Sequence, residues 1–151
     1  MVEIQLDELA GHKGSLCCYS PWLTITQDMI GAFADATGDH QWIHVDVERA
    51  KRESPWKCPV AHGYLTVSLI SRLNPQALRV AGTKATINYG LNKLRFPAAV
   101  PAGSDIRTKV ELVDITAVDD KRILATYKTT VEIDGQDKPA CVAENLAMYV
   151  V

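Results

Sequence analysis

The sequence contains no long hydrophobic run. No stretch approaches the roughly 20 apolar residues that a membrane-spanning helix requires. The first residues, Met1 to Asp7, carry acidic side chains where a secretory signal has a basic region followed by an apolar one. We therefore expect a cytoplasmic protein that makes no contact with a membrane.

An excess of positive charge is also absent. The 151 residues include 16 Lys and Arg and 18 Asp and Glu, so the formal net charge is −2. Proteins that bind nucleic acid rely on a basic surface to attract the phosphate backbone. Nucleic acid is therefore not an expected partner, and the composition favours a function that involves a small molecule or another protein.

Cysteines with the spacing of a metal site or a redox motif are missing as well. The four cysteines are Cys17, Cys18, Cys58 and Cys141, and none forms a Cys-x-x-Cys pair. Adjacent residues of an extended segment point to opposite faces, so Cys17 and Cys18 are poorly placed for a disulfide. Cys58 with His62 makes at most half of a metal site, because no second ligand pair of suitable spacing occurs. We expect reduced, buried thiols and no metal.

The sequence has the composition of one globular domain. Hydrophobic residues make up 47% and charged residues 23%, which is ordinary for a folded domain. There is no internal repeat, low-complexity tract or linker long enough to divide the chain. Residues 1–151 are therefore predicted to form a single domain with its own core.

A carboxylate and an imidazole follow the first predicted helix. Thr26 is the expected N-cap of a helix to about Thr37, and Gly38 is expected to end it in a left-handed conformation. Asp39 then begins an irregular segment, and a bent loop can bring it within hydrogen-bonding range of His44. Such a pair suits proton transfer near neutral pH. The alternative is that Asp39 caps a turn and His44 is an ordinary loop histidine.

A second, strongly apolar helix is predicted from Gly63 to Leu73, ending before Pro75. Its residues leave little polar face, which is typical of a helix that is buried nearly all round. The first N–H groups of a helix have no internal partner and carry partial positive charge. Gly63 at this end would let a substrate carbonyl approach the backbone closely. The alternative is that a glycine is needed there for packing or for its backbone dihedral angles.

Between these segments, Asp46 is the expected cap of a short helix over residues 47–53. Its charged residues include Arg49, Lys51 and Arg52. Runs of mixed charge usually form a solvated helix face. The functional alternative is that one of these cations contacts a nucleotide phosphate.

From Thr83 onward the hydrophobic pattern has a period of two, which predicts β-strands. Asp119-Asp120 and Asp134-Gly135 predict turns, and a shift of the pattern at Val113 predicts a bulge. Several long antiparallel strands preceded by one buried helix give an α+β class. Such a sheet keeps an exposed edge unless a second copy covers it, so we expect a homodimer or a dimer of dimers.

The string Thr37-Gly38-Asp39-His40-Gln41-Trp42-Ile43-His44, followed by His62-Gly63 and an apolar helix, resembles the MaoC-like dehydratase family. This family includes R-specific enoyl-CoA hydratases of the hot-dog fold, in which a curved antiparallel sheet wraps around a long central helix. The resemblance extends from about Thr24 to the C-terminus. Gln41 and Trp42 stand where many members have Asn and Pro, as in the branch named after nodulation protein N.

The resemblance implies a reaction and a set of residues. Water is added reversibly to a trans-2-enoyl thioester to give a 3-hydroxyacyl thioester of R configuration. Asp39 would take a proton from water, His44 would hold the water and supply the proton to C2, and the Gly63 N–H would bind the thioester oxygen. Gln41 and Tyr64 are expected to contact water or substrate, and Asn88 is a further candidate for contact with substrate.

No cofactor is implied beyond the carrier of the acyl group, which is either coenzyme A or an acyl carrier protein. Lys93 and Arg95 are candidates to bind the carrier, or else are ordinary strand-edge cations that prevent aggregation. Two further functions stay open. One is a thioesterase that directs water at the carbonyl carbon, and the other is a non-catalytic acyl-thioester-binding protein, which the Gln41-Trp42 departure favours.

Overall fold

The computed structural model describes residues 1–151 and is dominated by one antiparallel sheet. The strand order is β2-β6-β7-β8-β5, and β3 pairs with β6 beside this path. The bounds of these strands are β2 Cys17–Tyr19, β3 Leu23–Thr24, β5 Ala85–Arg95, β6 Asp105–Asp119, β7 Arg122–Ile133 and β8 Cys141–Val150. A second, parallel pair joins β1 Val2–Gln5 to β4 Leu78–Ala81.

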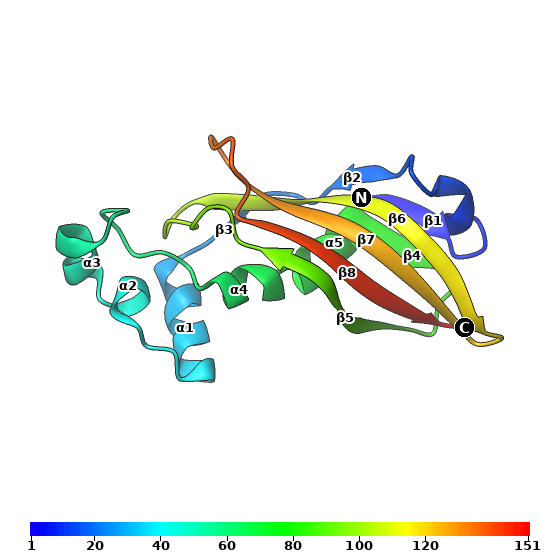
Figure 1. Ribbon diagram of the computed structural model, residues 1–151, viewed down its shortest axis with the longest axis horizontal. Helices are drawn as coiled ribbons and strands as arrows, with labels where there is room; N and C mark the ends of the chain where they lie inside the picture. The colour runs from blue at the N-terminus through cyan, green and yellow to red at the C-terminus, as the bar shows by residue number, and fades with distance from the viewer.

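The helices lie before and between the strands in sequence. They are a 3-10 helix η1 Leu9–His12 and the α-helices α1 Gln27–Thr37, α2 Trp42–Val45, α3 Val47–Glu53, α4 Gly63–Ser68 and α5 Ile70–Ala77. Figure 1 shows α1, α2 and α3 grouped at one end of the molecule, beyond the strands, while the curved sheet extends away from them. No helix is long and apolar enough to span a membrane.

The long strands form where the apolar residues alternate. On β6, Ile106, Thr108, Val110 and Leu112 are buried, whereas the residues between them are only partly buried. The pairing of β6 with β7 shifts register between Leu112 and Asp114, which confirms the predicted bulge at Val113. The predicted α+β class and the turns that end β6 and β7 are confirmed.

The central helix differs from the prediction in two ways. It is divided at Leu69 into α4 and α5, and it continues through Pro75 to Ala77 instead of ending before the proline. Proline removes one helical hydrogen bond. Here Leu73 and Ala77 flank Pro75, and their exposed fractions are only 1% and 0%. Packing in the core therefore keeps this last turn helical.

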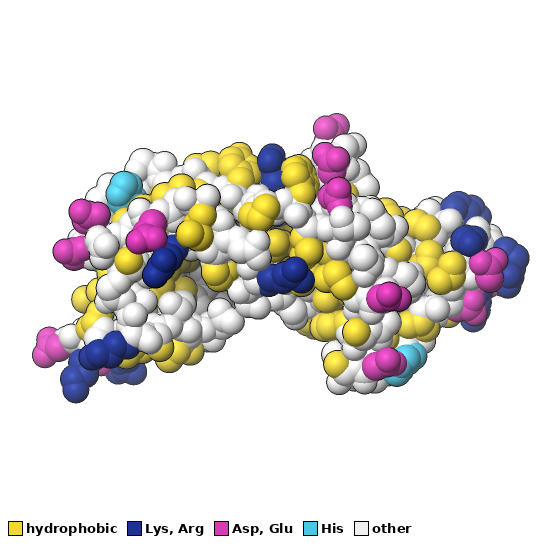
Figure 2. All heavy atoms as spheres, turned by 180° about the vertical axis from the view of Figure 1, so that it is seen from behind, with side chains coloured by type: hydrophobic (Ala, Val, Ile, Leu, Met, Phe, Trp, Pro, Cys, Tyr) yellow, Lys and Arg dark blue, Asp and Glu magenta, His cyan; other side chains and the backbone are white.

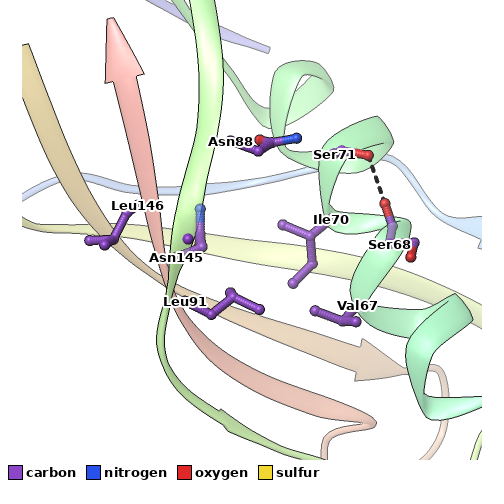
Figure 3. A pocket seen from close by; sticks show the side chains of 9 residues that line it. Val67, Ser68, Ile70, Ser71, Asn88, Leu91, Asn145 and Leu146 are labelled. Atoms are coloured by element: carbon purple, nitrogen blue, oxygen red, sulfur yellow. Dashed lines mark hydrogen bonds between the residues drawn. The ribbon is translucent and has the colours of Figure 1, made fainter. Parts of the chain in front are cut away.

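The helix is also not buried all round. Tyr64 is 72% exposed, and Ser68 and Ser71 on the same segment are exposed. A cavity of about 370 Å³ separates this side of the helix from strands β5 and β8. Figure 3 shows Val67 and Ile70 facing that space from the helix, with Asn88 and Leu91 opposite them. The sheet therefore covers only part of the helix.

The buried hydrophobic residues form two clusters. One joins α4 and α5 to the sheet beside α1 and includes Leu65, Ile70 and Leu73. The other joins β1, η1 and β4 to the same sheet and includes Leu9 and Leu112. The parallel pairing of β1 with β4 was not predicted from the sequence. Seen from behind, hydrophobic side chains remain exposed over the middle of the molecule (Figure 2).

Candidate active site

The end of α1 places Asp39. Thr26 caps the start of this helix by accepting a hydrogen bond from the Met29 N–H at 3.2 Å, and Gly38 ends it with φ at 77°. Both features confirm the prediction. The Asp39 side chain is 51% exposed, and its Oδ1 accepts a hydrogen bond from the Gln41 N–H at 3.3 Å. The carboxylate therefore also caps the turn that leads into α2.

His44 lies in α2 and is 7% exposed. Its Nδ1 lies 2.6 Å from the carbonyl oxygen of Val60. A carbonyl can only accept, so Nδ1 carries the hydrogen and Nε2 of the neutral ring is an open acceptor. Burial lowers the pKa of His44, against the opposing effects of the Val60 hydrogen bond and the Asp39 charge, and a proton on His62 would lower it further. His44 is therefore neutral near pH 7 and can accept a proton.

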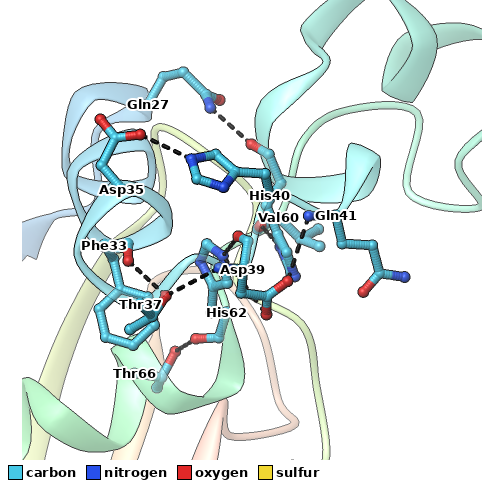
Figure 4. Close-up of polar contacts among 11 residues, drawn as sticks. Gln27, Phe33, Asp35, Thr37, Asp39, His40, Gln41, Val60, His62 and Thr66 are labelled. Carbon is cyan, nitrogen blue, oxygen red and sulfur yellow. Dashed lines mark hydrogen bonds and ion pairs between the residues drawn. The ribbon is translucent and has the colours of Figure 1, made fainter.

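His62 immediately precedes α4 and is 3% exposed. Its Nε2 lies 2.9 Å from the backbone oxygen of Asp39. The His62 ring stacks on the His44 ring with 3.8 Å between centroids, and the Phe33 ring lies 5.0 Å from it. Figure 4 shows His62 and Asp39 drawn together from segments that are far apart in sequence. From the sequence, His62 was considered as half of a possible metal site and as part of the His62-Gly63 motif, but its position beside Asp39 and His44 was not predicted.

Asp39, His44 and His62 each offer one polar atom, and these atoms lie within 4.8 Å of one another. The direct hydrogen bond expected between Asp39 and His44 is not formed, because Asp39 bonds to its own turn and His44 bonds to Val60. Two hydrogen bonds of about 2.8 Å that meet at one water oxygen span about 4.6 Å. A separation of up to 4.8 Å is therefore compatible with a water molecule held between the two side chains.

The same three residues have the types of metal ligands, but their arrangement suits an ion poorly. Imidazole lone pairs lie in the ring plane, so two ligands to one ion must have planes that converge on it. The His44 and His62 rings are instead stacked, with 26° between their planes. One nitrogen of each ring also faces a backbone carbonyl. The arrangement is better suited to holding water and moving protons.

Gly63 begins α4, next to this cluster. Its N–H makes no backbone hydrogen bond, as expected at the first position of a helix. A Cβ atom at this position would lie 3.1 Å from Cδ2 and Cε2 of Phe96, which is tighter than ordinary packing. Gly63 is not among the glycines with positive φ, so close packing against Phe96, not an unusual dihedral angle, explains the glycine.

A cavity of about 550 Å³ connects these features. It is lined by His44 and Gly63, by Thr66 of α4, and by Phe96 and Trp56. His44 and Gly63 of the same chain thus border one space, a relation that the sequence left open. Nine of its 15 lining residues are hydrophobic, so the cavity offers an apolar environment beside the polar cluster.

Two other predicted residues lie at the border of this region. Gln41 is the N-cap residue of α2 and is exposed, and Figure 4 shows its side chain extending away from Asp39 and His62. Tyr64 is exposed beside Gly63, and its ring meets the Phe96 ring edge-on at 6.5 Å. Tyr64 thus stands near the cavity, whereas Gln41 does not point toward the acid/base pair.

The remaining candidates lie elsewhere. Asn88 lines the cavity between α4, α5 and β5 shown in Figure 3, not the cavity that contains His44 and Gly63. Arg95 and Lys93 line a third pocket, of about 640 Å³, along the last residues of β5. Arg95 donates from Nη1 to the Leu94 carbonyl at 2.7 Å, and Lys93 Nζ lies 4.0 Å from a Glu144 carboxylate oxygen. Contact of these three residues with substrate or carrier stays a prediction.

The charged helix α3 pairs its own charges. Arg49 bonds to Glu53 and Lys51 bonds to Glu48, each at 2.9 Å, and Asp46 caps the helix as predicted. These contacts favour the solvated-face alternative.

The cysteines are free, as expected. Cys18 is buried and Cys17 is exposed, which agrees with opposite faces but corrects the expectation that all the thiols are buried.

Comparison with known proteins identifies the family. The sequence signature of the MaoC like domain matches residues 14–133. The chain is 50% identical over 143 residues to 3-hydroxyacyl-thioester dehydratase Z of Mycobacterium tuberculosis, covering 95% of this chain and 94% of that protein. Nodulation protein N of Rhizobium meliloti is 39% identical over 149 residues, covering 98% and 92%. The solved structure of the (R)-hydratase from A. caviae, involved in PHA biosynthesis, superposes with a TM-score of 0.71 at 26% identity, covering 89% and 97%.

The curved antiparallel sheet with its central helix is therefore a hot-dog domain that carries a candidate acid/base site at one end. Within this fold, the chain belongs to the MaoC-like dehydratase family. The fold and the family expected from the sequence are both confirmed.

Proposed function

We propose that this protein reversibly adds water to a trans-2-enoyl thioester and gives an (R)-3-hydroxyacyl thioester. The observation that carries the proposal is that His44 and the start of α4 border one cavity, and that Asp39 lies beside His44, within 4.8 Å of it. The similarity to a dehydratase of 3-hydroxyacyl thioesters supports the substrate class, and the similarity to an (R)-hydratase supports the configuration.

The proposed proton transfers follow from the state of the two side chains. Neutral His44 has no hydrogen on Nε2, so it accepts a hydrogen bond from the bound water, as Asp39 does. When the water oxygen bonds to C3, the pair receives one proton from the water, and it then returns one proton to C2. Both groups regain their starting state, and the thioester gains one H and one OH. A proton transfer of this kind contributes about 10²–10⁴-fold to the rate.

The oxyanion contact is assigned to the Gly63 N–H. Negative charge moves onto the thioester oxygen as water attacks C3, and a preplaced donor stabilises that charge. The Gly63 N–H is unbonded to the backbone and lies at the edge of the cavity that His44 also lines. Loss of one such donor typically lowers the rate by about 10²–10³-fold.

The carrier and the acyl chain are assigned to two pockets outside the acid/base cluster. Arg95 and Lys93 would meet the phosphates of coenzyme A or the acidic surface of an acyl carrier protein. An acyl chain directed along α4 would approach the second cavity, where Asn88 lies. The reaction as proposed uses a carboxylate, an imidazole and a backbone N–H, and it includes no cofactor besides the carrier. The four free thiols favour the cytoplasm as the location.

The proposal is tested by mixing the purified protein with crotonyl-CoA and longer trans-2-enoyl-CoAs and following the loss of the enoyl-thioester absorbance. We expect turnover by the wild type and a loss of about 10²–10⁴-fold in Asp39→Asn, because the base is removed. Asp35→Asn is the matched control, since Asp35 is an exposed carboxylate of α1 that pairs with His40. A dehydrogenase specific for (R)-3-hydroxyacyl-CoA then reports the configuration of the product.

Binding of these thioesters by the wild type without turnover would contradict the proposal and favour a non-catalytic acyl-thioester-binding protein. Release of free coenzyme A, detected with a thiol reagent, would instead indicate a thioesterase.

We also propose that the protein is a homodimer formed through β5. This strand is at the edge of the sheet, paired only with β8, and Ile87, Tyr89 and Leu91 on it are 50%, 62% and 45% exposed. An edge strand with exposed apolar residues pairs readily with a second copy. Light scattering after size-exclusion chromatography should give twice the chain mass for the wild type, and Tyr89→Glu should shift the mass toward one chain. A monomeric wild type would contradict this assembly, and four chains would indicate a dimer of dimers.

A further inference from the structure

His62 touches every part of the candidate site. It is the residue directly before Gly63, its ring stacks on His44 at 3.8 Å between centroids, and its Nε2 faces the backbone oxygen of Asp39 at 2.9 Å. Asp39 and His62 are 23 positions apart in the sequence. The segment that carries the acid/base pair is therefore tied to the start of α4 through this one imidazole.

The hydrogen-bond partners define the state of the ring. The Asp39 carbonyl can only accept, so His62 Nε2 carries the hydrogen and donates it. His62 Nδ1 is buried and has no hydrogen-bond partner. A protonated ring would therefore bury a second N–H without an acceptor, whereas the neutral ring leaves only an unpaired acceptor.

We propose that His62 is a positioning residue, which fixes the Asp39 backbone through its Nε2–H and the His44 ring through stacking, so that both face the Gly63 N–H. This role rests on the proposed hydration reaction. It assigns His62 no contact with the reacting atoms: the residue acts through Asp39 and His44.

A purely packing role does not account for the imidazole. The ring is buried against Phe33 and His44, and an apolar side chain would fill the same space without leaving Nδ1 unpaired. What the apolar side chain would lose is the Nε2–H donor. The Asp39 carbonyl follows the αL residue Gly38, in an irregular turn where this bond restrains the chain. The donor thus has a structural target that belongs to the acid/base pair.

Two substitutions separate the two contacts. His62→Phe keeps a ring against His44 but removes the donor. His62→Gln keeps a donor near the position of Nε2 but removes the ring. Because small displacements of reacting groups are costly, we expect His62→Phe to lower kcat by about 10- to 100-fold with KM nearly unchanged. We expect His62→Gln to recover most of that loss. His12→Phe, in η1 on the far part of the sheet, is the matched control and should leave kcat unchanged.

The pH profile adds a readout that a packing role would not move. Asp39 and His62 are the titratable groups that face His44: the Asp39 charge raises the His44 pKa, whereas a proton on His62 would lower it. Because His62 is neutral, the loss of its Nε2–H acts through Asp39: when the Asp39 segment is released, the pKa of His44 should fall, so the acid limb of kcat/KM in His62→Phe should move to lower pH. An NMR titration of the His44 ring in the same variant measures this shift without relying on turnover.

The outcomes are distinct. Turnover by the wild type, with a loss in His62→Phe, recovery in His62→Gln and a lower His44 pKa in His62→Phe, is the expected result. Full activity in His62→Phe, or an equal loss in His62→Gln, would overturn the positioning role and leave the hydratase proposal standing. An inactive wild type would overturn the hydratase proposal, and with it the role of His62 in turnover. Thermal melts identify any variant that fails to fold. If His62→Phe is one of them, His62→Gln decides: kcat and a His44 pKa near the wild-type values support the positioning role, and a large loss of kcat overturns it.

Discussion

The protein buries two pairs of polar aromatic side chains, and the two pairs differ in what they leave open. Tyr127 and Tyr149 lie on the neighbouring strands β7 and β8, and their hydroxyl groups bond to each other at 2.8 Å. Burial raises the pKa of both tyrosines, so both stay neutral. The rings of His44, in α2, and His62, directly before α4, are stacked, and one nitrogen of each ring faces a backbone carbonyl.

The difference shows how burial serves stability in one region and chemistry in the other. The two tyrosine hydroxyl groups bond to each other between neighbouring strands, and they border a separate cavity of about 220 Å³. The histidine pair keeps an open nitrogen on each ring, beside a half-exposed carboxylate and a cavity. Unsatisfied polar atoms cost stability, and they are also the atoms that can hold water and substrate.

The largest expected effect is on the histidine pair. His44→Asn keeps a donor for the Val60 carbonyl but removes the open acceptor, so kcat for enoyl-thioester hydration should fall by about 10²–10⁴-fold. The melting temperature should change little, because the buried hydrogen bond is kept. His40→Asn is the control, since His40 is exposed and pairs with Asp35. Equal activity of His44→Asn and the wild type would remove His44 from the reaction.

Gly63→Ala should have the next largest effect. The new Cβ would lie 3.1 Å from two atoms of the Phe96 ring, so either the ring or the start of α4 must move. A shift of the donor lowers kcat, and we expect about a 10- to 100-fold loss. Gly63→Ala combined with Phe96→Leu should recover part of this loss, because the smaller side chain relieves the contact. A double variant no better than Gly63→Ala would show that the contact with Phe96 is not the cause.

Tyr149→Phe should affect stability and leave activity unchanged. It strands the Tyr127 hydroxyl in a buried position, which should lower the free energy of unfolding by about 1–3 kcal/mol. Replacing both tyrosines by Phe should restore much of that loss. Urea unfolding at one fixed protein concentration, compared with the hydration rate, measures both quantities. A drop in activity in the double variant would connect the tyrosine pair to the site.

The smallest expected effect is the position of the acid limb of kcat/KM. Protonation of His44 removes its open acceptor, and burial lowers the pKa of His44 from its ordinary value of 6.5. The limb should therefore have its midpoint below pH 6.5, with full activity at pH 7. His40 would behave in the opposite way, because its hydrogen bond to Asp35 raises its pKa. A midpoint above 6.5 in a pH–rate profile would indicate a group other than His44.

The lowered pKa of His44 also affects the free energy of unfolding. His44 releases its proton more readily in the folded state than in the unfolded chain. Its contribution to stability is therefore present above pH 6.5 and is lost as the pH falls toward the lowered pKa.

Local patterns in the sequence determined much of the architecture. The alternation in β6 and β7, the cap at Thr26 and the glycine at position 38 act within a few residues, and the structure confirms each of them. They also placed Asp39 and His44 near each other beyond α1, although His44 lies in the short helix α2 and not in a loop. Neighbouring residues determine the backbone conformation at such positions, so a few adjacent residues of the sequence are enough to predict it.

The tertiary structure decided what depends on distant segments. It brought His62 to the Asp39 carbonyl, placed Phe96 against Gly63 and paired β1 with β4. It also kept the last turn of α5 helical through Pro75, against the local preference. No periodicity encodes these contacts, because each forms only when packing of the core brings separate parts of the chain together. The sequence therefore identified the candidate acid/base residues, and the fold determined their positions relative to the start of α4.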